Sequence, residues 1–368
     1  MTGQDMRRIV VVPGGGRVVL GSHRFVRADT ASLEIAPVFV GICGTDLDII
    51  AGTRNDEAAV LGHEAVVRIL SCPSTGCPVN TAEALCLINP VNPEDQDQII
   101  GHSDEGMLQE VVRIPRPRAW EGLVVPVRPG LDLLLATLSE PLGVALYGIE
   151  LLSDSRLPER LLVVGAGPMG LLTAVAAQLL GVREVGLVDR SGRRIRYATE
   201  SGLVPHHLAS TAYSGVLIQA FAPDAVALCV GREHRQGALN EAVRVAASGA
   251  RIDLVTGFQP GETLRGLPGV DLHGVRRANT CGRPRPGDAA TATTPQGKPL
   301  SLTGHRGTSQ RHLEDAMRLL LEHPSTFRRI ITDVVSLDEA PDVITSLVAA
   351  RGEPDTAPYR KLVVAMGS

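Results

Sequence analysis

Uninterrupted apolar runs mark the middle of the chain. Leu161 to Val164 is such a run, which is typical of a parallel strand buried on both faces. A helical stretch follows as far as Leu180, where Gly181 is expected to end it, and a second run covers Val185 to Val188. Two more buried strands and the helix between them are expected over 224–231, 250–258 and 238–249. This alternation predicts an α/β domain with a doubly wound parallel sheet.

The flanking regions have a different pattern. Residues 1–60 hold short strand-like stretches without a helical period, which predicts a small twisted β-barrel. An apolar helical stretch, Val144 to Leu152, is expected to lead from the barrel to the α/β domain. Residues 283–299 are rich in Pro, Gly, Ala and Thr and are longer than an ordinary connection, so we expect a mobile surface insertion there. A strand over 301–307 and an amphipathic helix over 311–323 are expected to follow.

The turn after the first apolar run has the pattern GxGxxG. Gly165 can make the tight turn, Gly167 has no Cβ to keep a pyrophosphate away, and Gly170 lets the helix lie close to the sheet. Pro168 suits the first helical turn, where a missing N–H costs nothing. Asp189 ends the second strand about 20 residues further on, where a carboxylate can accept both adenosine-ribose hydroxyls. Together these features predict a dinucleotide-binding unit rather than a chance glycine turn.

Length and composition indicate a two-domain globular protein. The chain has 368 residues, 44% hydrophobic and 21% charged, so a substantial core is expected. Its net charge of −4 without a basic stripe argues against nucleic acid and against a membrane surface as partners. The start, MTGQDMRR, has no apolar signal core, and no run approaches the ~18 apolar residues that span a bilayer. We therefore expect a cytoplasmic protein.

Two short motifs in the first part of the chain carry metal-ligand chemistry. Cys43 lies in GICGTD (residues 41–46), and His63 and Glu64 lie in GHE (residues 62–64). A thiolate, an imidazole and a carboxylate are the donors that catalytic zinc takes, with one position left for substrate or water. Either Cys43 or His63 alone is more often a buried structural residue, but the pair ahead of a dinucleotide-binding unit favours a metal site.

Here the chain resembles the zinc-dependent medium-chain dehydrogenases, and within them the branch that oxidises polyols, sugars and cyclitols. The resemblance covers nearly the whole chain and is most specific at four motifs: GICGTD, GHE, SEPLG (139–143) and VVGAGPMG (163–170). It implies a GroES-like β-barrel catalytic domain over 1–145 and 316–368 and a Rossmann domain over 146–315. The tail from Ser325 resembles the segment that returns to the catalytic domain, where its strands would close the barrel.

The resemblance also implies site residues. The transferred zinc ligands are Cys43, His63, Glu64 and Glu140, for one catalytic zinc. The residues transferred to catalysis are Thr45, Asp46, Asp48, Glu64 and Glu140. Thr45 resembles a hydroxyl relay that carries the substrate proton away, and Asp46 resembles the acid that orients the zinc histidine, although a helix N-cap is an alternative role for Asp46.

The cofactor and substrate residues are transferred in the same way. The cofactor set is Gly165, Gly167, Pro168, Met169, Gly170, Asp189 and Arg194. Arg194 matches a position near the adenosine, with a solvated helix face as the equal alternative. Glu110, in GMLQE (106–110), resembles a glutamate that faces sugar substrates, or is merely exposed.

The chain departs from the family pattern in two places. Asp48 stands where many members have a relay histidine, so either a carboxylate or water does that work. The region of the structural zinc lobe, 89–115, holds none of the four closely spaced cysteines found in many members. The cysteines before it, Cys72, Cys77 and Cys86, have spacings that fit no closed tetrahedral site, so we expect free thiols.

The function implied is hydride transfer between a secondary alcohol of a polyol, sugar or cyclitol and a nicotinamide cofactor. NAD is favoured over NADP because Asp189 would repel a 2′-phosphate. A zinc-free reductase of the same superfamily and a non-catalytic nucleotide-binding protein are the alternatives. The resemblance further implies a homodimer or homotetramer, with the small-molecule substrate as the only other partner.

Overall fold

A computed structural model describes residues 6–24, 32–72, 83–115, 122–211, 221–283, 290–351 and 358–367. The chain divides into two compact units, each described by itself below. The first unit is Met1–Glu140, Ser309–Gly352 and Lys361–Ser368; the second is Pro141–Thr308 and Glu353–Arg360. Among the described helices, none has both the length and the apolar character to cross a membrane.

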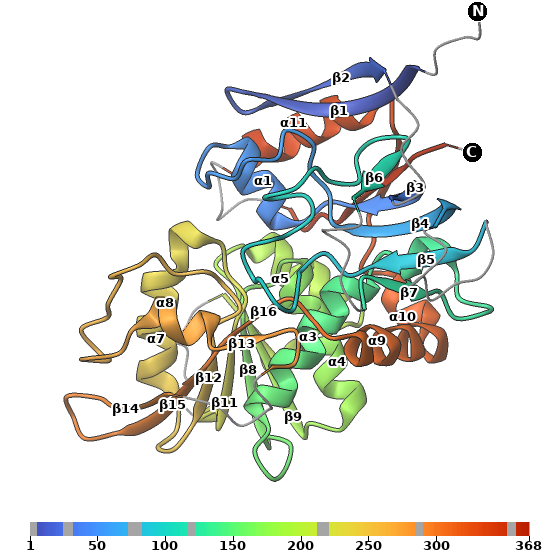
Figure 1. Ribbon diagram of the computed structural model, residues 1–368. Coiled ribbons are helices and arrows are strands. Elements are labelled where there is room, and N and C mark those ends of the chain that lie inside the picture. Colours follow the sequence, from blue (N-terminus) through green and yellow to red (C-terminus); the bar gives the residue numbers. More distant parts are fainter. Residues whose placement is uncertain are drawn as a thin grey trace, which may run out of the picture. The chain divides into compact units, whose positions relative to one another are not determined.

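The first unit is built on a seven-stranded sheet (Figure 1). Six strands follow in the order β17 (Asp333–Ser336), β18 (Leu362–Ala365), β3 (Leu33–Gly41), β4 (Glu64–Ser71), β5 (Leu85–Ile88) and β7 (Val124–Pro126). The seventh, β6 (Val112–Ile114), pairs with β3, and β1 (Met6–Gly14) and β2 (Arg17–Arg24) form a separate antiparallel pair. The tail strands β17 and β18 therefore join the sheet of the N-terminal strands, as the resemblance of the tail implies.

In the described part of the first unit, helices complete the structure. They are α1 (Gly44–Ile50), α2 (Leu133–Ala136), α9 (Gln310–Glu322), α10 (Pro324–Arg328) and α11 (Ala340–Ala350). Helix α11 packs against β2 and α1, so a C-terminal helix covers N-terminal elements. The core between these elements is aliphatic, with Ile35, Val67 and Ile69 buried.

The second unit has the doubly wound sheet that the apolar runs predict. Its order is β10 (Ala209–Ser210), β9 (Glu184–Val188), β8 (Arg160–Val164), β11 (Ala225–Leu228), β12 (Arg251–Asp253), β15 (Pro299–Thr303) and β14 (Ala290–Thr293). All are parallel except β14. The order reverses direction at β8, which confirms the Rossmann prediction and places the ligand edge at the strands' carboxyl ends.

Helices and short elements surround this sheet. They are α3 (Ser139–Leu152), α4 (Pro168–Leu180), α5 (Gly192–Glu200), α7 (Arg235–Val245), α8 (Leu272–Arg277), the 3₁₀ turns His206–Leu208 and Arg232–His234, and the parallel pair β13 (Asn279–Thr280) and β16 (His305–Arg306). Helix α3 begins at the last residues of the first unit.

The glycine turn between β8 and α4 has the geometry that the pattern predicts. Gly165 has φ of +105°, in the left-handed region that favours glycine. A Cβ on Gly170 would lie 1.7 Å from the Gly165 carbonyl oxygen, so only glycine lets α4 start this close to the strand. Helix α4 ends at Leu180, and Gly181 follows in the left-handed conformation, as predicted.

Two expectations need correction. The predicted insertion 283–299 is not irregular throughout, because β14 pairs antiparallel with β15 and extends the sheet; residues 284–289 lie outside the described residues. Thr and Ala alternate in β14, a pattern that suits an edge strand better than a loop. Cys72 is disulfide-bonded, so the free-thiol prediction is wrong there. Cys86 is free, and Cys77 lies outside the described residues.

Candidate metal centre

Two antiparallel strands bring the metal-ligand motifs together. Gly41, at the end of β3, pairs with Glu64, at the start of β4. Cys43 follows two residues after the end of β3, and His63 directly precedes β4. The register of one strand pair therefore places a thiol, an imidazole and a carboxylate at the same end of the sheet.

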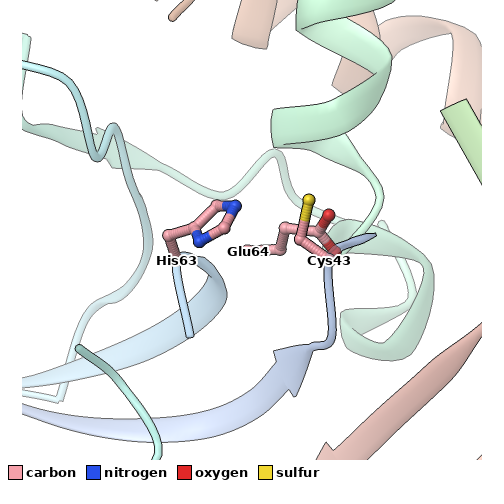
Figure 2. Close-up of side chains that lie close together, drawn as sticks. All are labelled: Cys43, His63 and Glu64. Carbon is pink, nitrogen blue, oxygen red and sulfur yellow. The ribbon is translucent and has the colours of Figure 1, made fainter. Parts of the chain in front are cut away.

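The three donors form a compact cluster (Figure 2). The Sγ of Cys43, a ring nitrogen of His63 and a carboxylate oxygen of Glu64 all lie within 4.8 Å of one another. His63 and Glu64 are buried and Cys43 is partly exposed. Among the described residues this is the group of three or more donors close enough to hold an ion. The mixed S, N and O set with one partly exposed member suits a catalytic zinc with an open position.

Asp46 connects the two segments that carry the ligands of this cluster. Its Oδ2 accepts the backbone N–H of Cys43 at 2.8 Å, and its Oδ1 accepts the N–H of Gly62 at 3.3 Å. The same Oδ1 lies 3.5 Å from Nδ1 of His63. Asp46 therefore contacts both the start of α1, as a helix-capping residue would, and His63, as an acid that orients the histidine would. Because Nδ1 faces the carboxylate, Nε2 is the ring nitrogen left for a metal.

The charges at Asp46 and His63 reinforce each other. Burial raises the pKa of Asp46, but the His63 charge, its hydrogen bond and the Cys43 and Gly62 N–H groups bring it below its usual value. Burial lowers the pKa of His63, but Asp46 and then Cys43 raise it well above its usual value. The carboxylate thus stays ionised beside the ring, the state in which it orients a metal-binding imidazole.

Lys361 is a site residue that the sequence reasoning missed. Its Nζ contacts the Glu64 carboxylate and donates to the Ile42 carbonyl at 3.0 Å, and Lys361 and Glu64 are 1% and 2% exposed. A signal was present in the composition, because only two of the 36 basic residues are lysine, Lys298 and Lys361.

Lys298 also binds backbone carbonyls. Its ammonium donates to the carbonyls of Val243, Arg244 and Ala246, which suits a compact charge with three donors.

Glu140 lies outside the three-donor cluster but within reach of its charges. It is the second residue of α3 and is partly buried. Burial raises its pKa to about 7; the charges of Glu64 and Asp46 add to this rise, while His63 and Lys361 oppose it. A carboxyl group with such a pKa can exchange a proton near neutral pH.

The other transferred residues have partners of their own. Thr45 has its Oγ1 3.7 Å from the Cys43 Sγ. Asp48 is paired with Arg351, whose Nη2 is 2.7 Å from its carboxylate. Glu110 accepts the backbone N–H and the Nε–H of Arg8 at 2.8 and 2.7 Å. The Glu110 carboxylate therefore holds β1 in place, and its contact with substrate stays a prediction.

The cofactor residues lie together at the start of the Rossmann unit. A Cβ on Gly167, the N-cap of α4, would meet no atom within 4 Å, which leaves room for a pyrophosphate at this helix N-terminus. Pro168 and Met169 form the first turn of α4. The Asp189 carboxylate accepts the N–H groups of Ala166 and Ser191, both at 2.7 Å. Arg194 lies 3.6 Å from it.

Known proteins resemble the chain over most of its length. An uncharacterized zinc-type alcohol dehydrogenase-like protein of Haemophilus influenzae is 26% identical over 329 residues, which are 84% of this chain and 85% of that protein. The similarity is to the zinc-type alcohol dehydrogenase-like proteins, a superfamily also called medium-chain dehydrogenases. No family model matches the chain.

Solved structures of proteins named as dehydrogenases have the same fold. A provisionally named zinc-binding dehydrogenase of Sinorhizobium meliloti, bound to NADP, has a TM-score of 0.71 at 22% identity and covers 99% of this chain and 100% of its own. Galactitol-1-phosphate dehydrogenase of Escherichia coli has a TM-score of 0.70 at 16% identity, with 98% and 100% covered. The fold is thus that of a GroES-like unit combined with a Rossmann unit.

Proposed function

We propose that this protein is a zinc-dependent medium-chain dehydrogenase that transfers hydride between a secondary alcohol of a polyol, sugar or cyclitol and NAD. The observation that carries the proposal is the cluster of Cys43, His63 and Glu64. A zinc-free reductase or a non-catalytic nucleotide-binding protein has no use for a partly exposed thiol with a buried imidazole and a buried carboxylate, all within 4.8 Å of one another.

Each residue near the metal centre has a separate task in the proposed reaction. Cys43, His63 and Glu64 would hold the ion, and Asp46 keeps the His63 ring oriented. A Zn²⁺ ion held by these residues would supply a Lewis acid for the substrate hydroxyl. The Thr45 hydroxyl lies 3.7 Å from the cysteine sulfur and would take the substrate proton on its way to solvent.

The second unit would hold the hydride acceptor. The glycine turn and the N-terminus of α4 fit a dinucleotide pyrophosphate, because Gly167 leaves space and backbone N–H groups are free to bind an anion there. Asp189 stands at the end of β9, the usual place for a ribose-binding acid.

The polar residues around the metal centre and the low aromatic content of the chain support a polyol, sugar or cyclitol as substrate. Only 3% of residues are aromatic, so few aromatic side chains can line an apolar channel for hydrophobic alcohols. Thr45, Asp48 and Glu140 lie in the segments around the metal centre, and a site built to bind hydroxyls rejects analogues that lack them. The resemblance to a dehydrogenase named for galactitol 1-phosphate supports the same substrate class.

The test combines metal analysis with a substrate panel. We expect about one zinc per chain and NAD⁺ reduction with inositols, aldoses or sorbitol rather than with ethanol, and loss of both zinc and turnover in Cys43→Ala. Cys86→Ala, which removes another free thiol of the first unit, is the matched control and is expected to keep both. Normal turnover in Cys43→Ala contradicts the metal assignment, and preference for ethanol contradicts the substrate class.

A further inference from the structure

Residues 89–115 stand where the resemblance places the structural zinc lobe. This segment packs directly against the loop of residues 58–63, which ends at His63. Gly106, Met107 and Leu108 donate backbone hydrogen bonds to Val60, Gly62 and Leu61 in turn, at 2.7, 2.9 and 3.0 Å. A Cβ on Gly106 would lie 2.4 Å from the Leu61 carbonyl group. At Gly106 the segment therefore lies closer to the loop of His63 than a side chain would allow.

This close approach brings His102 onto His63. The two rings have centroids 4.9 Å apart and planes at 84° to each other, and both side chains are buried. The backbone carbonyl of His102 accepts the N–H of Ala58 at 2.8 Å, so the turn that carries the ring is fixed to the same loop. Aromatic rings prefer such perpendicular contacts to face-to-face stacking.

A second pair of residues fixes the His102 ring itself. Arg54 donates from Nη2 to Nδ1 of His102 at 3.0 Å. The guanidinium is in turn held by Asp56, which accepts from both Nε and Nη2. Because a guanidinium only donates, Nδ1 of His102 must accept and cannot serve as a metal ligand. His102 also lies outside the three-donor group around Cys43.

We propose that His102 is a positioning residue for the metal centre: its ring, anchored by Arg54 and Asp56, fixes the plane of the His63 ring, while Asp46 fixes its Nδ1 side. This inference rests on the proposed zinc site and adds a second support that no transferred motif includes. The shortened lobe thus supplies an aromatic support to the ligand histidine. The contact acts on the geometry of His63, so its loss is expected to appear in metal affinity before it appears in the fold.

The experiment measures zinc affinity of the full chain by competition with a chromophoric chelator, and the visible absorption spectrum after loading with Co²⁺. We expect His102→Ala to weaken zinc affinity about 10–100-fold and to change the Co²⁺ bands. His102→Phe keeps a ring at the contact but cannot accept from Arg54, and the double variant Arg54→Met/Asp56→Asn likewise removes the anchor but not the ring. Both are expected to bind zinc more tightly than His102→Ala and less tightly than the unmodified protein.

His312 provides the matched control. It is a buried histidine of α9 in the same unit whose Nε2 accepts from Arg311 at 3.1 Å. His312→Ala is expected to lower stability without changing zinc affinity. The proposal is overturned if His102→Ala binds zinc as the unmodified protein does, or if His312→Ala loses as much affinity. If His102→Ala does not fold, unchanged affinity in the double variant overturns it. An unmodified chain that binds no zinc overturns the proposed function as well.

Discussion

At the scale of single residues, the least expected group is the buried ammonium of Lys361 beside a proposed zinc ligand. Removing one partner of a buried ion pair leaves an uncompensated charge, which costs about 3–5 kcal/mol. We therefore expect Lys361→Met to lower the free energy of unfolding of the first unit by about that amount, measured by chemical denaturation.

Two further variants separate the ion pair from general damage. The double variant Lys361→Met/Glu64→Gln removes both charges and is expected to lose less stability than the single one. Lys298, whose ammonium binds backbone carbonyls, is partly exposed, so Lys298→Met is expected to lower the free energy of unfolding by less than Lys361→Met does. A single Lys361→Met variant as stable as the unmodified chain contradicts the ion pair.

At the scale of elements, the β8–α4–β9 unit presents a fixed negative charge. Both oxygens of Asp189 accept backbone N–H groups, so the carboxylate is held at the end of β9 where a 2′-phosphate would meet it. We expect kcat/KM with NAD to exceed that with NADP by at least about tenfold, because like-charge contacts cost several kcal/mol.

Arg194 opposes this preference. Its Nη1 lies 3.6 Å from the Asp189 carboxylate, so its positive charge offsets the repulsion of a 2′-phosphate by Asp189. Arg194→Ala is therefore expected to increase the ratio of NAD to NADP efficiency, and Asp189→Ala to decrease it. Equal efficiencies with the two cofactors in the unmodified enzyme would show that the arginine outweighs the acid.

At the scale of the whole molecule, a buried acid makes stability depend on pH. Asp253 of β12 is 0% exposed, and burial raises its pKa to about 7, with Arg276 opposing the rise. His305 lies 3.9 Å away, and a Cβ on Gly148 would lie 2.8 Å from the carboxylate, so α3 covers the group closely.

The sign of the effect follows from proton binding. Between about pH 4 and pH 7 the folded Asp253 keeps a proton that the unfolded chain has released, so stability falls as pH rises through this window and stays lower above it. Asp253→Asn, which copies the neutral form, is expected to remove this fall and to unfold less readily than the unmodified chain at pH 8, by up to about 4 kcal/mol. Denaturation of both proteins at pH 5 and pH 8 measures it. Parallel pH dependences would contradict the assignment.

The sequence by itself determined the features that depend on neighbouring residues. The strand, turn and helix from Arg160 to Leu180 follow from an apolar run, glycine sterics and a helix end, all within one short segment. The donor types at Cys43, His63 and Glu64 were also readable, because each motif is local and one strand pair joins them. Their roles in binding and catalysis stay predictions.

Only the tertiary structure decided which distant groups complete the centre. Lys361 meets Glu64 across 297 residues of sequence, and His102 meets Arg54 across 48. A buried charge or ring takes its partner from whichever segment the fold packs beside it, and hydrophobic periodicity carries no information about that choice. The same reason explains β14, whose short polar alternation became a strand only because the edge of β15 was available to pair with it.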